Sequence, residues 1–208
     1  MVIEIAGHPA KPSLGRWLQA SPARMGSQAC YRGPQMILIF EGADRVGKST
    51  LADRFSAKHG WPVVKMRWAL VGDERAETLG IAAATIELLQ ALRPDVILDR
   101  CYFSMWAYGS QTAYLPELIA RFDRVSRSTE ARLVLLTVSP EELQRRYERE
   151  PDLYFSLETI QAANARFPSL LPLLPASLPH LHLDTTNTPP DEAFAQVDAF
   201  INTPRLDA

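Results

Sequence analysis

The sequence has little cysteine, no long apolar run and almost no net charge. Two cysteines among 208 residues are too few for a disulfide framework or a cysteine-rich metal site. No apolar stretch approaches the ~20 residues that a membrane-spanning helix needs. We therefore expect a soluble, cytoplasmic protein with no membrane partner. A formal net charge of −2 gives no global attraction to nucleic acid, so any attraction for phosphate must be local.

Residues 1–35 differ in composition from the rest of the chain. They are rich in proline and glycine, carry four basic residues against one acid, and show no sustained hydrophobic periodicity. Such a segment buries too little apolar surface to offset the entropy of ordering it. We predict a poorly ordered extension over 1–35, followed by one folded domain over 36–208. A transit peptide and a short edge strand at 2–5 are left open.

A glycine-rich stretch follows the first apolar run of the domain. Residues 36–40 are Met-Ile-Leu-Ile-Phe, and residues 42–49, the phosphate loop, are Gly-Ala-Asp-Arg-Val-Gly-Lys-Ser. This order fits the pattern of glycine, four residues, glycine, lysine and then serine or threonine. Helix-forming residues follow at once, so the loop amides would meet an anion at a helix N-terminus. The pattern predicts a nucleoside triphosphate site.

Each residue type in the phosphate loop suits that role. Gly42 and Gly47 permit backbone angles that a side chain would forbid. Lys48 would bring its charge to the β- and γ-phosphates, and the Ser49 hydroxyl would bind Mg²⁺. ATP and Mg²⁺ are therefore the expected cofactors. The predicted nucleotide-binding set is Gly42, Ala43, Asp44, Arg45, Val46, Gly47, Lys48, Ser49 and Thr50.

Strand patterns alternate with helical patterns from residue 36 onward. Strands are predicted at 36–41, 61–66, 95–99, 131–138 and 180–184. Helices are predicted at 48–59, 75–92, 102–110, 115–128, 140–150, 157–167 and 190–201, with a proline-broken loop at 168–179. This alternation is typical of an α/β fold in which a parallel sheet is covered on both faces. Ligands are then expected at the carboxyl ends of the strands.

The third predicted strand ends in Asp99-Arg100. An acid at the carboxyl end of a strand, beside a phosphate loop, is placed to hold Mg²⁺, often through water. The arginine would offer its fork of donors to a second phosphate. Alternatively, Asp99 and Arg100 form a purely structural salt bridge at the end of the strand.

Two segments resemble thymidylate kinases. Residues 96–108, Val-Ile-Leu-Asp-Arg-Cys-Tyr-Phe-Ser-Met-Trp-Ala-Tyr, look like the family segment Asp-Arg-Tyr, then Ser, then Ala-Tyr or Ala-Phe. Residues 41–50 resemble the branch of this family whose loop carries Asp-Arg between its glycines. Coarse similarity covers 36–201. The resemblance implies a three-layer P-loop kinase fold, with a five-stranded parallel sheet, flanking helices and a short arginine-bearing lid. It also implies a homodimer.

The resemblance implies roles for single residues. Asp44 would contact the sugar 3′-hydroxyl of an acceptor nucleotide, and Arg45 would neutralise the transferring phosphoryl group. Arg100 would bind the acceptor 5′-phosphate. Arg67 matches a family arginine near the acceptor, although its neighbours depart from the family sequence. The remaining predicted acceptor contacts are Glu41, Ser104 and Tyr108.

The charged run 145–150 follows the fourth predicted strand. It stands where related kinases have a mobile lid whose arginines close over the phosphates and exclude water. Arg145 and Arg149 are the predicted lid arginines, and the sequence does not decide between them and Arg45 at the transition state. A solvated helix with charge pairs such as Glu142–Arg146 is the alternative. The other members of the expected catalytic set are Lys48, Arg45, Asp99 and Arg100.

Charge requirements separate two classes of kinase. A nucleoside kinase needs a carboxylate to deprotonate a neutral hydroxyl, whereas a monophosphate kinase needs arginines and Mg²⁺ to bring two polyanions together. The resemblance implies that both classes have a glutamate at the position of Glu41, so this residue does not separate them. Arg45 and Arg100 favour the monophosphate kinase. The sequence thus predicts transfer of the γ-phosphoryl group of ATP to a deoxynucleoside monophosphate, with dTMP implied by the resemblance.

The identity of the acceptor base is left open. Cys101 replaces the family tyrosine, and the residues after Tyr108 depart from the family pattern. Trp68 and Trp106 are candidates to stack on a base, or else belong to the core. The alternatives are a deoxynucleoside kinase, a kinase of a hydroxymethylated pyrimidine nucleotide or DNA base, and a regulatory nucleotide-binding module.

Overall fold

The computed structural model describes residues 2–6, 35–67, 87, 95–101, 103–109 and 115–204, and every structural statement below concerns these residues. The elements follow in the order β1 (Val2–Ala6), β2 (Met36–Glu41), α1 (Lys48–His59), β3 (Val63–Arg67), β4 (Val96–Asp99), α3 (Phe103–Tyr108), α4 (Leu115–Ser128), β5 (Glu130–Thr137), α5 (Pro140–Arg149), α6 (Leu157–Arg166), η3 (Phe167–Leu173), β6 (His180–Asp184) and α7 (Pro190–Asn202). Of the long helix predicted at 75–92, only Glu87 is described, and it is helical.

A central sheet with the strand order β1-β3-β4-β2-β5-β6 organises the described part of the chain. The pairs β3–β4, β4–β2, β2–β5 and β5–β6 are all parallel, which confirms the predicted α/β fold with five parallel strands. β1 lies antiparallel to β3 at the edge, with Val2 opposite Arg67. The edge strand left open by the sequence is therefore present. The predicted poor order of the extension falls on residues 7–34, which lie outside the described residues.

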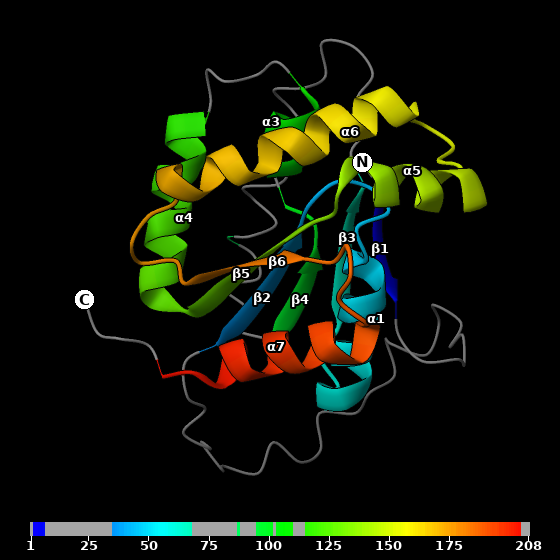
Figure 1. Cartoon of the computed structure of the whole chain (residues 1–208). Helices are drawn as coiled ribbons and strands as arrows, with labels where there is room; N and C mark the ends of the chain where they lie inside the picture. The colour runs from blue at the N-terminus through cyan, green and yellow to red at the C-terminus, as the bar shows by residue number, and fades with distance from the viewer. Residues whose placement is uncertain are drawn as a thin grey trace, which may run out of the picture.

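Helices cover both faces of this sheet. Figure 1 shows α1 and α7 on one face and α3, α4 and α6 on the other, as the predicted three layers require. The central strand β2 is buried from Ile37 to Phe40 on both sides, which explains its continuous apolar run. No helix within the described ranges has the length and apolar character needed to cross a membrane.

Local signals in the sequence set the ends of two helices. Gly60 ends α1 with a φ of 71°, and its N–H donates to the Ser56 carbonyl at 2.8 Å. Ser139 caps α5, because its hydroxyl accepts the N–H of Glu142 at 3.3 Å, and Pro140 occupies the first helical position. Both ends agree with the predicted boundaries.

The proline-rich stretch after α6 differs from its prediction. The sequence predicted a loop of short turns over 168–179, whereas Phe167–Leu173 forms the 3₁₀-helix η3. Pro168 stands at the start of η3, where no backbone N–H is needed, and Phe167 and Leu170 are buried. A short 3₁₀-helix therefore accommodates the prolines while its apolar residues pack against the core.

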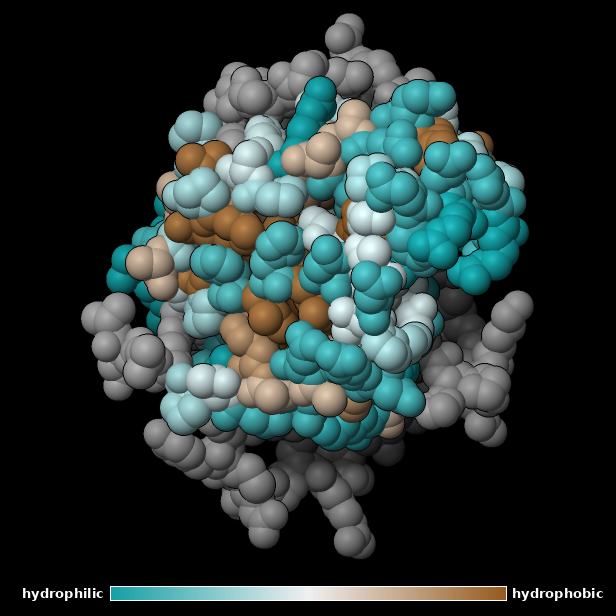
Figure 2. Space-filling view, in the orientation of Figure 1, coloured by the Kyte–Doolittle hydropathy of each residue, from teal (hydrophilic) through white to brown (hydrophobic). Residues whose placement is uncertain are grey.

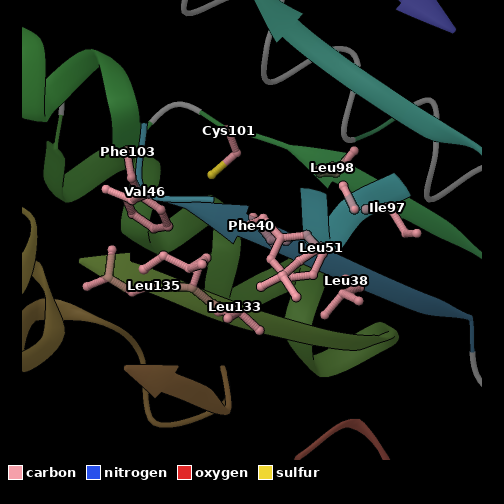
Figure 3. Packing of buried hydrophobic residues seen from close by; sticks show 14 of the residues in the cluster. Leu38, Phe40, Val46, Leu51, Ile97, Leu98, Cys101, Phe103, Leu133 and Leu135 are labelled. Atoms are coloured by element: carbon pink, nitrogen blue, oxygen red, sulfur yellow. The ribbon is translucent and has the colours of Figure 1, made fainter. Parts of the chain in front are cut away.

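The core joins the strands to the phosphate loop and to α3. Val46 from the loop and Phe103 from α3 are fully buried with Leu38 and Phe40 of β2, in the cluster of Figure 3. The side chain of Val46 thus anchors the phosphate loop in the core. Trp106, a candidate base-stacking residue in the sequence, packs against this core from α3.

Phe55 should be a major source of stability, because it joins three elements. Its fully buried ring lies 6.1 Å from that of Phe40 in β2 and 4.4 Å from that of Phe194 in α7, measured between ring centroids. We expect Phe55→Ala to lower the free energy of unfolding by about 3–5 kcal/mol in urea denaturation. Ala57→Gly, at an exposed position of the same helix, should cost only about 1 kcal/mol. Equal losses in the two variants would contradict this packing.

Candidate active site

The phosphate loop connects β2 to α1 and requires glycine at two positions for different reasons. Gly42 has a φ of 140°, and a Cβ there would lie 2.3 Å from the carbonyl oxygen of Leu136 in β5. Gly47 has a φ of 100° and precedes α1, with open space around it. Close approach of two backbones therefore fixes Gly42, and a left-handed angle fixes Gly47.

Two arginines share the left-handed conformation. Arg45 has a φ of 68° and Arg100 a φ of 77°, and they are the non-glycine residues with positive φ in the described ranges. Side chains rarely adopt this conformation, and strained residues of this kind gather at functional sites. Both arginines were predicted to neutralise phosphate charge, so the two strained backbone positions coincide with residues for which the sequence predicts a function.

Lys48 lies at the start of α1, with only 5% of its surface exposed. Its ammonium group donates to the Ala43 carbonyl of its own loop. Burial, with help from the nearby Arg100 cation, lowers the pKa of Lys48 to about 8, against the opposing influence of neighbouring carboxylates. The first turn of α1 carries no acid, and Ser49 and Thr50 are exposed. This helix end therefore suits an anion.

Ser49 and Asp99 meet at the carboxyl ends of the strands. The Ser49 hydroxyl donates to Oδ2 of Asp99 at 2.7 Å, and Asp99 ends β4. In the described ranges no group of three or more His, Cys, Asp or Glu gathers to hold a metal by itself. A hydroxyl and a carboxylate oxygen fit Mg²⁺, which commonly takes one or two protein ligands and completes its shell with phosphate oxygens and water.

Arg100 folds back over the phosphate loop. Its Nη1 donates to the Gly42 carbonyl at 3.1 Å and to the Ser104 hydroxyl at 3.0 Å, while Nη2 pairs with the Asp44 carboxylate. Tyr108 completes the cluster, because its hydroxyl donates to Oδ2 of Asp44 at 2.6 Å and accepts the Asp44 N–H at 2.7 Å. Arg100, Asp44, Ser104 and Tyr108 were all predicted acceptor contacts, and they lie together.

Electrostatics fix the charges in this cluster at neutral pH. Burial alone would raise the pKa of Asp44, but the Arg100 and Lys48 cations outweigh it and hold that pKa below its usual value. Burial would lower the pKa of Arg100, and the Asp44 anion reverses that effect. Burial also raises the pKa of Tyr108, so its hydroxyl keeps its proton. The cluster is a partly buried ion pair restrained by a neutral hydrogen-bond donor.

Glu41 accepts hydrogen bonds from residues 101 and 104, next to Arg100 in the chain. Its Oε1 accepts the N–H groups of Cys101 and Ser104 at 2.8 and 3.2 Å, and its Oε2 accepts the Ser104 hydroxyl at 2.5 Å. Burial raises the pKa of Glu41, and the hydrogen bonds from Ser104 and Cys101 oppose that change. Both carboxylate oxygens are thus occupied in orienting residues 101–104.

The Arg45 side chain contacts the segment that follows α5. Its Nη1 lies 2.8 Å from Oε1 of Glu150, and its Nη2 donates to the Pro151 carbonyl at 2.9 Å. Glu150 and Pro151 follow α5, so this predicted phosphate ligand contacts the lid region. No pattern in the sequence indicates that contact.

The arginines of α5 differ in their exposure and partners. Arg145 is exposed and pairs with Glu142 at 2.7 Å, and Arg149 is exposed, in agreement with the polar outer face of α5 in Figure 2. Their action on phosphates stays a prediction. Arg146 was expected only as a charge partner of Glu142, and that pair is present at 2.8 Å. Arg146 also donates to the Arg45 carbonyl at 3.1 Å and to the Thr185 carbonyl at 2.7 Å.

A simple signal would have identified Arg146. It follows the buried Leu143 by three positions, so both residues lie on the inward face of α5. Arg67 ends β3, but its side chain lies outside the described residues, as does Trp68. Their predicted contacts with the acceptor stay predictions.

Solved structures of similar fold exist, although no protein-family model and no curated protein sequence matches the chain. YorR from Bacillus subtilis, solved with phosphorylated GDP, has a TM-score of 0.58 and 21% identity over 79% of this chain and 95% of that chain. Thymidylate kinase from Candida albicans has a TM-score of 0.54 and 19% identity over 81% and 91% of the two chains. A deoxyadenosine kinase from M. mycoides, solved with dCMP and dCDP, has a TM-score of 0.56 and 14% identity over 80% and 98%. These likenesses confirm the P-loop kinase fold.

The pKa of Lys48 predicts how nucleotide binding depends on pH. The ammonium group is charged below a pKa of about 8 and loses its charge above it. We expect the affinity for a non-hydrolysable ATP analogue, measured without divalent metal, to fall by up to about tenfold per pH unit above this value. Lys48→Arg should remove the dependence, because a guanidinium stays charged over this range. A parallel decline in both proteins would contradict the assignment.

Proposed function

We propose that the protein is a Mg²⁺- and ATP-dependent phosphotransferase that moves the γ-phosphoryl group of ATP to the 5′-phosphate of a deoxynucleoside monophosphate. dTMP is the proposed acceptor, because the segments at 41–50 and 96–108 resemble those of thymidylate kinases. One observation carries the proposal. Arg100 Nη1 lies 3.1 Å from the Gly42 carbonyl, so a second cation stands directly against the phosphate loop that contains Lys48.

The donor would lie across the start of α1. Lys48 and the loop amides would bind the β- and γ-phosphates, since the helix end favours negative charge. Ser49 and Asp99 would hold Mg²⁺, which when bound neutralises charge on the donor phosphates. The Ser49 hydroxyl lies 2.7 Å from Oδ2 of Asp99, which supports this role because both oxygens could then contact the same ion.

The acceptor would lie against Arg100 and Asp44. Arg100 has a fork of donors that suits a phosphate, and a phosphate would replace Asp44 as its counterion. Asp44 keeps its negative charge at neutral pH and would then accept a hydrogen bond from a sugar hydroxyl. Tyr108 would restrain the Asp44 carboxylate during this exchange, because its hydroxyl donates to Oδ2.

A deoxynucleoside kinase is the second candidate, and Glu41 is the residue that bears on it. Its raised pKa moves the carboxyl group towards the range of a general base. However, both of its oxygens accept hydrogen bonds from residues 101 and 104, so an acceptor hydroxyl would have to displace one of them. The two cations beside the loop favour an acceptor that is already a phosphate.

Two further properties are proposals: the first rests on the resemblance, and the second on the lack of a long apolar run in the sequence. We propose that the protein is a homodimer and acts in the cytoplasm. Size-exclusion chromatography with light scattering tests the first, and localisation of a tagged full-length chain tests the second.

An acceptor panel tests the reaction. Purified protein with ATP and Mg²⁺ should phosphorylate dTMP, and the product should be dTDP by chromatography. Other deoxynucleoside monophosphates, thymidine and DNA with hydroxymethylated pyrimidines complete the panel. Phosphorylation of thymidine without phosphorylation of dTMP would favour the nucleoside kinase. Tight binding of ATP with no turnover of any acceptor would favour a regulatory module.

Substitutions at Arg100 and Lys48 should separate the acceptor from the donor. Arg100→Ala removes charged hydrogen bonds to the acceptor phosphate, so the KM for the acceptor should rise about 10- to 100-fold with a smaller change for ATP. Lys48→Ala should chiefly lower kcat. Arg124→Ala, at an exposed position of α4, should leave both parameters near those of the parent protein. Equal and mild effects of the first two changes would contradict these roles.

A further inference from the structure

The Arg45 side chain has an incomplete set of partners where it lies. Its two terminal nitrogens contact Glu150 and the Pro151 carbonyl at 2.8 and 2.9 Å. Its Nε is buried, and no partner for it occurs among the described residues. The side chain is 21% exposed, whereas that of Glu150 is 75% exposed. Arg45 is therefore held by a solvent-facing anion that leaves one donor unsatisfied.

The backbone of Arg45 is fixed independently of its side chain. Arg146 donates to the Arg45 carbonyl at 3.1 Å, and the Thr185 hydroxyl donates to the Val46 carbonyl at 3.0 Å. These contacts come from α5 and from the loop after β6. A movement of the Arg45 guanidinium consequently need not move the phosphate loop.

Residues 150–155, which follow α5, are attached unequally at their two ends. Near Glu150 the attachment is the polar contact with Arg45. At the other end the Phe155 ring packs 4.8 Å from the Tyr108 ring, between centroids, and the Tyr147 hydroxyl donates to the Phe155 carbonyl at 3.3 Å. Between these ends Leu153 and Tyr154 are 89% and 78% exposed.

We propose that residues 150–155 form a latch in which Glu150 holds Arg45 away from the donor until a triphosphate displaces it. Glu150 is then a positioning residue that acts through Arg45, and the latch opens at its Glu150 end while Phe155 stays packed. This inference rests on the proposed binding of a nucleoside triphosphate to the phosphate loop.

Arg45 should bind a triphosphate more strongly than it binds Glu150. An ion pair with one exposed partner is weak, because water and salt screen it. A triphosphate carries several charges and offers paired oxygens to the guanidinium. It would also give Nε an acceptor. Release of Glu150 frees residues 150–154, so binding of the donor is coupled to loosening of the lid.

Glu150→Gln tests the latch with a non-hydrolysable ATP analogue and no acceptor. The matched control is Glu148→Gln, which makes the same charge change at an exposed position of α5. We expect Glu150→Gln to bind the analogue about two- to fivefold more tightly than Glu148→Gln, the factor that loss of a weak ion pair provides. Amide hydrogen exchange at residues 152–156 should rise by a similar factor without the analogue. Both differences should vanish in an Arg45→Ala background.

The outcomes separate the latch from the proposed reaction. Equal affinities of Glu150→Gln and Glu148→Gln would overturn the latch, as would a gain that persists in the Arg45→Ala background. Failure of the parent protein to bind the analogue would overturn the latch and the proposed function together. Binding of the analogue with the expected differences, but no turnover of dTMP, would overturn the acceptor and leave the latch in place.

Discussion

The ion pair between Asp44 and Arg100 is the interaction on which the candidate site depends. It joins the phosphate loop to the segment after β4, two parts of the chain that are distant in sequence. Partial burial of both charges is costly unless each has a partner, and Gly42, Ser104 and Tyr108 supply the remaining hydrogen bonds. The pair therefore sets both the shape of the loop and the charge that a substrate would meet.

Lys48, Arg100 and Arg45, the three cations predicted to bind phosphate, are each held by an oxygen of the protein. Lys48 donates to the Ala43 carbonyl, Arg100 pairs with Asp44, and Arg45 pairs with Glu150. Each cation thus has a protein oxygen as its partner, and an incoming phosphate would replace that oxygen. Protein oxygens compensate the like charges before a substrate arrives, so Lys48 and Arg100, which are proposed to bind phosphate, already stand beside the loop, and Arg45 is held on Glu150.

Sequence alone predicted the elements whose signals are local. The phosphate loop has a fixed spacing, the Asp99-Arg100 pair ends an apolar strand, and alternating patterns gave the parallel sheet. The spacing from Leu143 indicates that Arg146 lies on the inward face of α5, but its contact with the loop, like that of Arg45 with Glu150, depends on where α5 packs. Glu41 shows the same limit: its position was evident from the sequence, but its three hydrogen bonds with residues 101 and 104 required the tertiary structure.

A structure bound to a bisubstrate analogue, with adenosine and thymidine joined by a polyphosphate chain, tests the replacement of protein oxygens by phosphates most directly. We expect Lys48 on the donor phosphates, Arg100 on the phosphate nearest thymidine and Arg45 released from Glu150. Asp44 should then contact the sugar. An analogue seated on the loop while Arg100 remains paired with Asp44, and Arg45 with Glu150, would contradict the central claim.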